Sequence, residues 1–167
     1  MTHPSAAGPD DDDLDHDVDG PDRTAVLPDD AVTRALDELA AKLARDLRGV
    51  ADVETDAVRG TASCDVLPHR AGALGVWWVH DAESLEVGVG EAGGWEVGRD
   101  AAGLARATHV VWAAVHGRVR VCLTPRRTRY AVDLPDGSTL VDERRRPAAA
   151  LLRGPWRVPA HDAPAYR

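Results

Sequence analysis

The sequence predicts an α+β fold: an antiparallel meander sheet with an N-terminal amphipathic helix and a second helix packed on it, preceded by a disordered acidic N-terminal tail. Two patterns predict the folded part. Residues 73–99 alternate apolar and polar side chains with a period of two, which is typical of antiparallel strands. Residues 31–47 repeat leucine and other apolar side chains at helical spacing, which indicates a helix with one apolar stripe.

Composition divides the 167 residues into three segments. Residues 1–30 carry ten aspartates against one arginine, and residues 1–28 also hold four prolines, so we expect 1–28 to be disordered. The remaining chain is nearly neutral, with 18 acidic and 19 basic residues. We predict a single α+β domain over residues 29–143 and an Arg/Pro-rich C-terminal extension over 144–167. Within this extension we expect a short helix at 148–153 and an anchoring role for Trp156.

The first half of the predicted domain is a helix followed by the meander. Asp29 or Asp30 is the expected N-cap of the helix, which ends near Gly49. The strand at 74–80 is apolar on both faces, so we expect it to be central in the sheet and covered on both sides. Arg59-Gly60 is the expected turn of the first hairpin. Five strands are predicted in all, at 50–58, 61–67, 74–80, 85–90 and 94–98.

The second half is predicted to begin with another helix, capped by Asp100 and ending at Gly117. An alternative interpretation is a strand at 109–115 that forms a hairpin with the next strand. Pro135-Asp136-Gly137 is typical of a turn and would join the last two strands. Three strands are expected here, at 118–124, 128–134 and 138–142.

Residues 88–93 match the G-x-G-x-x-G pattern of nucleotide-binding loops. A dinucleotide site needs a helix to begin there, but a further alternating strand follows. A kinase-type loop needs a strand lysine together with His-Arg-Asp and Asp-Phe-Gly motifs, whereas the only lysine is Lys42, in the first helix. We interpret the glycines as turn residues, with Gly93-Gly94 forming a hairpin, and expect no cofactor.

The sequence does not predict a metal site. Residues 15–20, DHDVDG, match the start of an EF-hand loop, but Val26 stands where the bidentate glutamate belongs. The possible zinc ligands show no recognised ligand spacing. These possible ligands are Cys64, His69, His80, His109, His116 and Cys122.

Several features predict a cytoplasmic protein. The N-terminus lacks the basic start and apolar core of a signal peptide, and no apolar run reaches membrane-spanning length. The two cysteines have no C-x-x-C spacing, so we expect free thiols. Isoleucine, phenylalanine, asparagine and glutamine are absent, which indicates a GC-rich bacterial genome.

The preferred functional interpretation is a small cytoplasmic, non-catalytic module that binds an unidentified partner protein. One alternative is a small enzyme with a Cys/His site around Cys122, whose thiol pKa neighbouring arginines could lower. Another is nucleic-acid binding through the Arg-rich C-terminal third, although aromatic side chains for base stacking are scarce there. The possible interaction surface comprises Trp77, Trp78, Arg118, Arg120, Arg126, Arg127 and Arg129.

Overall fold

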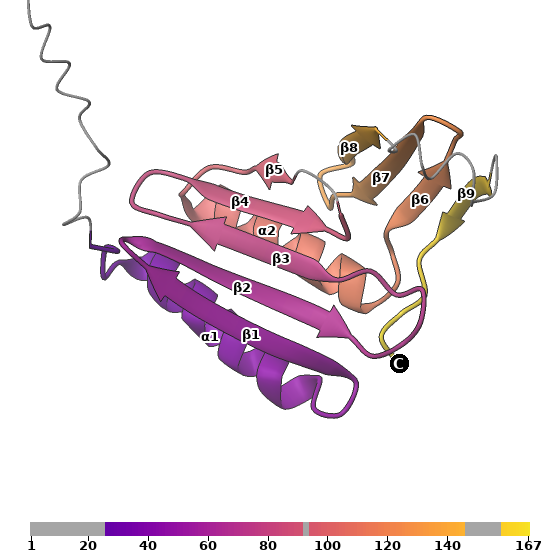
Figure 1. Cartoon of the computed structure of the whole chain (residues 1–167). Coiled ribbons are helices and arrows are strands. Elements are labelled where there is room, and N and C mark those ends of the chain that lie inside the picture. The colour runs from indigo at the N-terminus through magenta and orange to yellow at the C-terminus, as the bar shows by residue number, and fades with distance from the viewer. Residues whose placement is uncertain (1–25, 92–93, 146–157) are drawn as a thin grey trace, which may run out of the picture.

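The computed structural model describes residues 26–91, 94–145 and 158–167, which form two helices and two antiparallel sheets. This arrangement confirms the predicted α+β class. In Figure 1 a five-stranded sheet, sheet A, forms the front layer and both helices lie behind it. The predicted disordered tail, apart from its last three residues, the short helix at 148–153 and Trp156 lie outside the described residues.

The first helix, α1, spans Ala31–Asp46 and begins where the sequence predicts. The side chain of Asp30 accepts a hydrogen bond of 2.9 Å from the backbone N–H of Thr33, which caps the helix. The apolar stripe of the helix, including Leu36 and Leu43, is buried against sheet A. Burial of this stripe, rather than helix propensity alone, stabilises a helix of 16 residues.

Sheet A is a meander in which each strand pairs with the next along the chain. Its first hairpin turns through Arg59 and Gly60, which both have positive φ (50° and 78°), as a type I′ turn requires. The third strand is central, as predicted, but described elements cover only its helix side, so Trp77 and Val79 remain partly exposed. The strands are β1 (Ala51–Val58), β2 (Thr61–Pro68), β3 (Val76–His80), β4 (Leu85–Val89) and β5 (Trp95–Glu96).

The second helix, α2, spans Ala101–Val115, which excludes the alternative strand at 109–115. The side chain of Asp100 caps it by accepting a hydrogen bond of 2.7 Å from the N–H of Gly103. Val110 and Val111 are fully buried, in the same core as Trp78 and Val87 from sheet A. The core therefore lies between sheet A and the two helices.

The remaining strands form sheet B, in the order β8-β7-β6-β9. The sequence predicts three of these strands but not the fourth, β9, which pairs with β6. The residues after β9 also join the core: Ala163 and Tyr166 are buried, and the Tyr166 hydroxyl donates a hydrogen bond of 2.8 Å to the carbonyl of Leu74. The strands are β6 (Arg120–Leu123), β7 (Arg127–Asp133), β8 (Thr139–Arg145) and β9 (Val158–Asp162).

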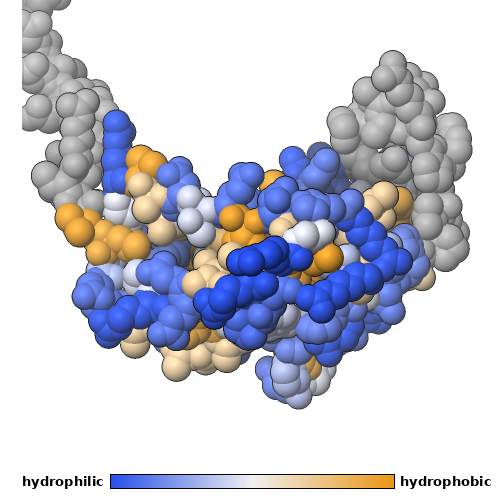
Figure 2. All heavy atoms as spheres, turned by 90° about the horizontal axis from the view of Figure 1, so that it is seen from below, coloured by the Kyte–Doolittle hydropathy of each residue, from blue (hydrophilic) through white to orange (hydrophobic). Residues whose placement is uncertain are grey.

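The surface of the molecule is largely polar. Figure 2 views it from below, where hydrophilic side chains cover most of the visible area and apolar side chains form smaller patches between them. Only a few large apolar side chains among the described residues are exposed, including Leu67 and Val58 on sheet A. Hydrophilic side chains therefore dominate the face seen in this view.

Candidate functional site

The face of sheet A opposite the helices is open, because no described helix or strand packs on it. It is the face turned toward the viewer in Figure 1. Strand register assigns side chains to this face, since directly paired residues point to the same side of a sheet and neighbours along a strand alternate. We call this surface the acidic face. It comprises Asp52, Glu54, Asp56, Val58, Thr61, Ser63, Asp65, Leu67, Trp77, Val79, Glu86, Gly88 and Glu96.

Two rows of side chains cross the acidic face. In the first row, Glu54 lies opposite Asp65, which lies opposite Trp77. In the second row, Val79 lies opposite Glu86, which lies opposite Glu96. Each row therefore places two carboxylates directly across from each other beside an apolar side chain. Like charges in this position destabilise a sheet.

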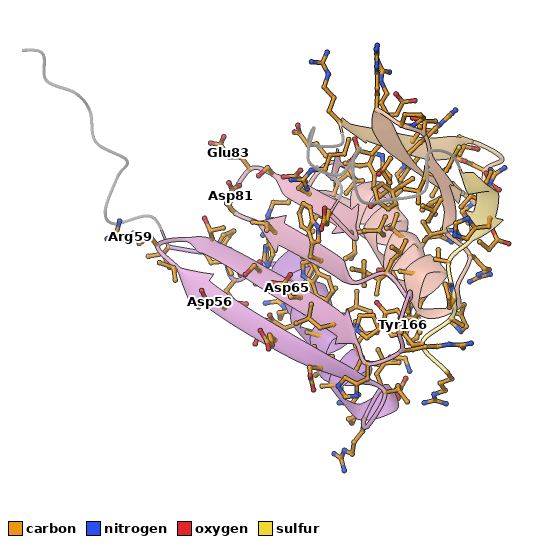
Figure 3. The ribbon with its side chains drawn as sticks, turned by 45° about the vertical axis from the view of Figure 1, so that its right-hand side comes forward. Asp56, Arg59, Asp65, Asp81, Glu83 and Tyr166 are labelled. Carbon is orange, nitrogen blue, oxygen red and sulfur yellow. The ribbon has the colours of Figure 1, made fainter. Side chains whose placement is uncertain are left out.

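The carboxylates of both rows have no basic partner in the part of the chain that the structure describes. Within the described residues, no ion pair involves Glu54, Asp65, Glu86 or Glu96, and the face's one ion pair joins Asp52 to His69 at 3.1 Å. Further carboxylates lie at one end of the sheet, where Figure 3 shows Asp56 near the first hairpin turn and Asp81 and Glu83 in the β3–β4 loop. The only basic side chain in either of these turns is Arg59.

Trp77 lies flat on the acidic face because the neighbouring strand has no side chain beneath it. A Cβ atom at Gly88 would lie 2.3 Å from Cζ2 of the indole, and one at Gly94 would lie 2.6 Å from Cη2. The indole therefore covers the backbone of β4 and reaches toward β5. Gly88 thus leaves room for the Trp77 indole, a role that the interpretation of the glycines as turn residues missed. The contact depends on a tryptophan eleven positions earlier in the chain.

The tryptophan pair is divided between the two sides of sheet A, as the alternation in a strand requires. Trp78 is 2% exposed and belongs to the core, whereas Trp77 is partly exposed. Trp78 is therefore not available to a protein partner. Of the two predicted contact tryptophans, only Trp77 lies at the surface.

The outer face of sheet B carries three of the predicted arginines, and each has an acidic neighbour. Arg120 contacts Asp133 at 2.5 Å, while Arg127 and Arg129 approach Glu143 at 2.7 Å and 3.9 Å. These exposed pairs contribute little to stability, but they neutralise part of the positive charge. The Arg-rich surface is therefore less cationic than its sequence indicates.

The other two predicted arginines are Arg126 and Arg118. Arg126 is exposed in the turn that leads to β7. Arg118 lines a cavity of about 410 Å³ between α2 and sheet B, together with His109 and Asp133. In this cavity a ring nitrogen of His109 lies 2.9 Å from the carbonyl oxygen of Asp133. Arg120 lines this cavity as well, so Arg118 and Arg120 lie close together at its edge.

The structure does not bring Cys122 together with a histidine in one cavity. Cys122 lines a shallow cavity of about 340 Å³ on sheet B with Arg120, Arg129 and Val141. His109 belongs to the neighbouring cavity, and His80 lies on the helix side of sheet A. Cys64 is buried beneath α1, and burial raises the pKa of its thiol to about 12, which keeps it protonated and a poor nucleophile.

The described residues contain neither a metal-binding cluster nor a membrane-spanning helix. No three side chains of histidine, cysteine, aspartate or glutamate gather closely enough there to hold a metal ion. Neither α1 nor α2 has the length and apolar character needed to cross a membrane. No protein-family model matches the chain, and comparisons with curated proteins and with solved structures likewise gave no match.

Proposed function

We propose that this protein is a non-catalytic interaction module that binds a basic segment of a partner protein on its acidic face. One observation carries the proposal: two cross-strand carboxylate pairs, Glu54 with Asp65 and Glu86 with Glu96, flank Trp77 and Val79 on an open sheet face. Charge complementarity favours a partner rich in arginine or lysine, because bound cations replace repulsion between the carboxylates with attraction.

The repulsion between two opposed carboxylates is small compared with the stability of a folded domain. A directly opposed like-charged pair destabilises a sheet by roughly 0.2–1 kcal/mol. Two such pairs therefore lower the free energy of unfolding measurably without unfolding the protein. A cation seated between two such carboxylates would remove this repulsion. Exposed charges are screened over about 8 Å at physiological salt, so we expect salt to slow association with a basic partner.

Trp77 supplies the apolar part of the surface. Its indole already lies against the backbone at Gly88, so little side-chain freedom remains to be lost when a partner binds. A tryptophan face attracts the guanidinium of arginine through a cation–π contact and packs on aliphatic stems. Tryptophan is also among the residues that contribute most to protein interfaces.

A cytoplasmic location is part of this proposal. Both Cys64 and Cys122 are free cysteines, which suits a reducing compartment. The acidic segment at residues 1–28 would compete with the acidic face for a basic partner and would thereby tune the encounter. The Cys122 enzyme and the nucleic-acid binder remain alternative predictions.

The proposal is tested by nuclear magnetic resonance titration of the full chain with the peptide Arg-Leu-Arg-Leu-Arg-Leu-Arg. We expect shifts of the Trp77 indole N–H and of amides in β2, β3 and β4, and weaker binding as salt increases. The matched peptide Glu-Leu-Glu-Leu-Glu-Leu-Glu should leave these signals unchanged. Shifts confined to residues 1–25 or to sheet B would contradict the proposal.

Matched variants separate a contact from a general loss of structure. Trp77→Ala should weaken binding of the arginine peptide by about tenfold or more, as expected for an interface hot spot. Trp112→Ala removes a partly exposed tryptophan from α2, on the other side of sheet A, and should leave the affinity unchanged. A single-stranded DNA oligonucleotide that shifts the Arg120 and Arg129 signals would support the nucleic-acid alternative.

A further inference from the structure

A groove lies between the N-terminal half of α1 and the hairpin end of sheet A, and its lining reaches Asp56 and Ser63 of the acidic face. Its volume is about 340 Å³, within the range of small-molecule sites. We call it the α1 groove. It is lined mainly by small or apolar side chains from the helix and strands, including Leu36, Ala40, Ala62, Cys64, Trp78 and His80.

His80 is the unusual member of this lining. It is 2% exposed, yet its Nδ1 atom has no hydrogen-bond partner among the described residues. Buried polar atoms are nearly always hydrogen bonded, so an unpaired imidazole nitrogen needs an explanation. His80 also lines the groove, and a turn of the ring by about 180° about its Cβ–Cγ bond exchanges each ring nitrogen with a carbon atom.

The surroundings of His80 limit what the groove can bind. Burial and the nearby Arg99 lower the pKa of His80, so the imidazole is neutral. The thiol of Cys64 in the same groove is neutral as well. The groove therefore combines apolar walls with a neutral imidazole and a neutral thiol. Its lining also includes the carboxylates of Asp37 and Asp56, which disfavour an anionic ligand.

We propose that the α1 groove binds a small, neutral, mainly apolar molecule that carries one hydroxyl group, and that His80 receives this hydroxyl. A hydroxyl both donates and accepts, so it can pair with the imidazole in either tautomer. The apolar walls formed by Leu36, Ala40 and Trp78 would enclose the rest of the molecule. The groove borders the acidic face at Asp56 and Ser63, but His80 lies on the helix side of sheet A.

Phenol is a suitable probe, because it joins an apolar ring to one hydroxyl. We expect phenol to shift the imidazole ¹⁵N signals of His80 and the amide signals of Leu36 and Cys64. Toluene has the same shape without the hydroxyl, so it should bind several-fold to about tenfold more weakly, the range expected for one hydrogen bond. Equal affinities for phenol and toluene would overturn the proposal.

Two variants complete the test. His80→Leu keeps an apolar side chain of similar size in the groove wall, and it should abolish the preference for phenol over toluene. His116→Leu changes an exposed histidine at the end of α2 and should preserve the preference. Phenol shifts that appear only outside the α1 groove, or a preference that survives in His80→Leu, would also overturn the proposal. Neither result would alter binding of the arginine peptide to the acidic face.

Discussion

The outer faces of the two sheets differ in how their charges are arranged. On sheet A, strand register opposes carboxylate to carboxylate, as in Glu54 and Asp65. On sheet B it opposes Arg129 to Glu143. It also opposes Arg127 to Arg145, but Arg127 reaches the carboxylate of Glu143 at 2.7 Å. Both faces carry many charges. Among the described residues, Arg120, Arg127 and Arg129 of sheet B have acidic partners, whereas Glu54, Asp65, Glu86 and Glu96 of sheet A take part in no ion pair. The density of charge in a sequence therefore does not by itself locate a binding surface.

The opposite sides of the two sheets explain why sheet A tolerates the repulsion. The inner face of sheet A packs on α1 and α2 through fully buried side chains such as Val66, Val76 and Val87. This burial contributes far more to stability than two exposed carboxylate pairs remove. The acidic face can therefore keep an unfavourable arrangement that suits a partner.

The largest expected effect comes from Gly88→Ala. Alanine normally stabilises a strand relative to glycine, but here the new Cβ would lie 2.3 Å from the Trp77 indole. We expect Gly88→Ala to lower the free energy of unfolding by about 1–3 kcal/mol and to displace the Trp77 indole signal. Denaturant unfolding and the indole N–H resonance measure both effects.

A double-mutant cycle isolates the contact. In a Trp77→Ala background, Gly88→Ala should be neutral or stabilising, because the clash is gone. On sheet B, Ala131→Val adds bulk to the outer face of β7 and should change stability by less than about 0.5 kcal/mol. Equal losses from Gly88→Ala in both backgrounds would show that the indole does not lie over β4.

A second prediction concerns the inner face of sheet A. His80→Leu removes an unpaired buried imidazole, so we expect it to raise the free energy of unfolding by about 1 kcal/mol near neutral pH. Thermal or denaturant unfolding of the two proteins at one pH measures this difference. A large loss of stability in His80→Leu would show that the imidazole has a partner that stabilises the fold.

The same substitution should change how stability depends on pH. The pKa of His80 is lowered by burial and by Arg99, against the opposing charges of Asp30, Asp37 and Asp81. The unfolded chain therefore binds a proton on His80 where the folded protein does not, so the free energy of unfolding falls as pH drops below about 6.5. His80→Leu should make this decline shallower between about pH 7 and pH 5.

The smallest expected effects come from mirrored charge reversals on the two sheets. Glu54→Lys places a cation opposite Asp65 and should stabilise the protein by about 0.2–1 kcal/mol. Glu143→Lys places a cation opposite Arg129 and beside Arg127, and should destabilise by a similar amount. Chemical denaturation at low salt measures both, and changes of the same sign would remove the distinction between the sheets.

The helices and the meander were predictable because their signals are local. Leucine spacing and the Asp30 cap locate α1, and alternation with the Arg59-Gly60 turn locates the first hairpin. The strand β9 was not predicted, since VPAHD contains a proline and lacks clear alternation. Proline is tolerated at a sheet edge, and β9 is the last strand in the order of sheet B, so pairing with β6 rather than local pattern determines this strand.

The candidate site was predictable only in part. Neighbouring residues of a strand point to opposite faces of the sheet, so Trp77 and Trp78 had to lie on different faces. The sequence did not show which of the two is buried. The pairing of Arg129 with Glu143 depends on the register of β7 and β8, as the repulsion between Glu86 and Glu96 depends on that of β4 and β5. A single sequence contains no direct record of strand register, so the sequence analysis favoured the arginines and overlooked the acidic face.

The most direct test of the account measures stability and binding together in the variant Glu54→Lys/Glu86→Lys. Each substitution replaces a repulsive carboxylate pair with an attractive pair on the acidic face. We predict that the free energy of unfolding increases while the affinity for the arginine peptide falls by about tenfold or more. Unchanged affinity in a stabilised variant would contradict the claim that these carboxylates bind a basic partner, and so would a loss of stability.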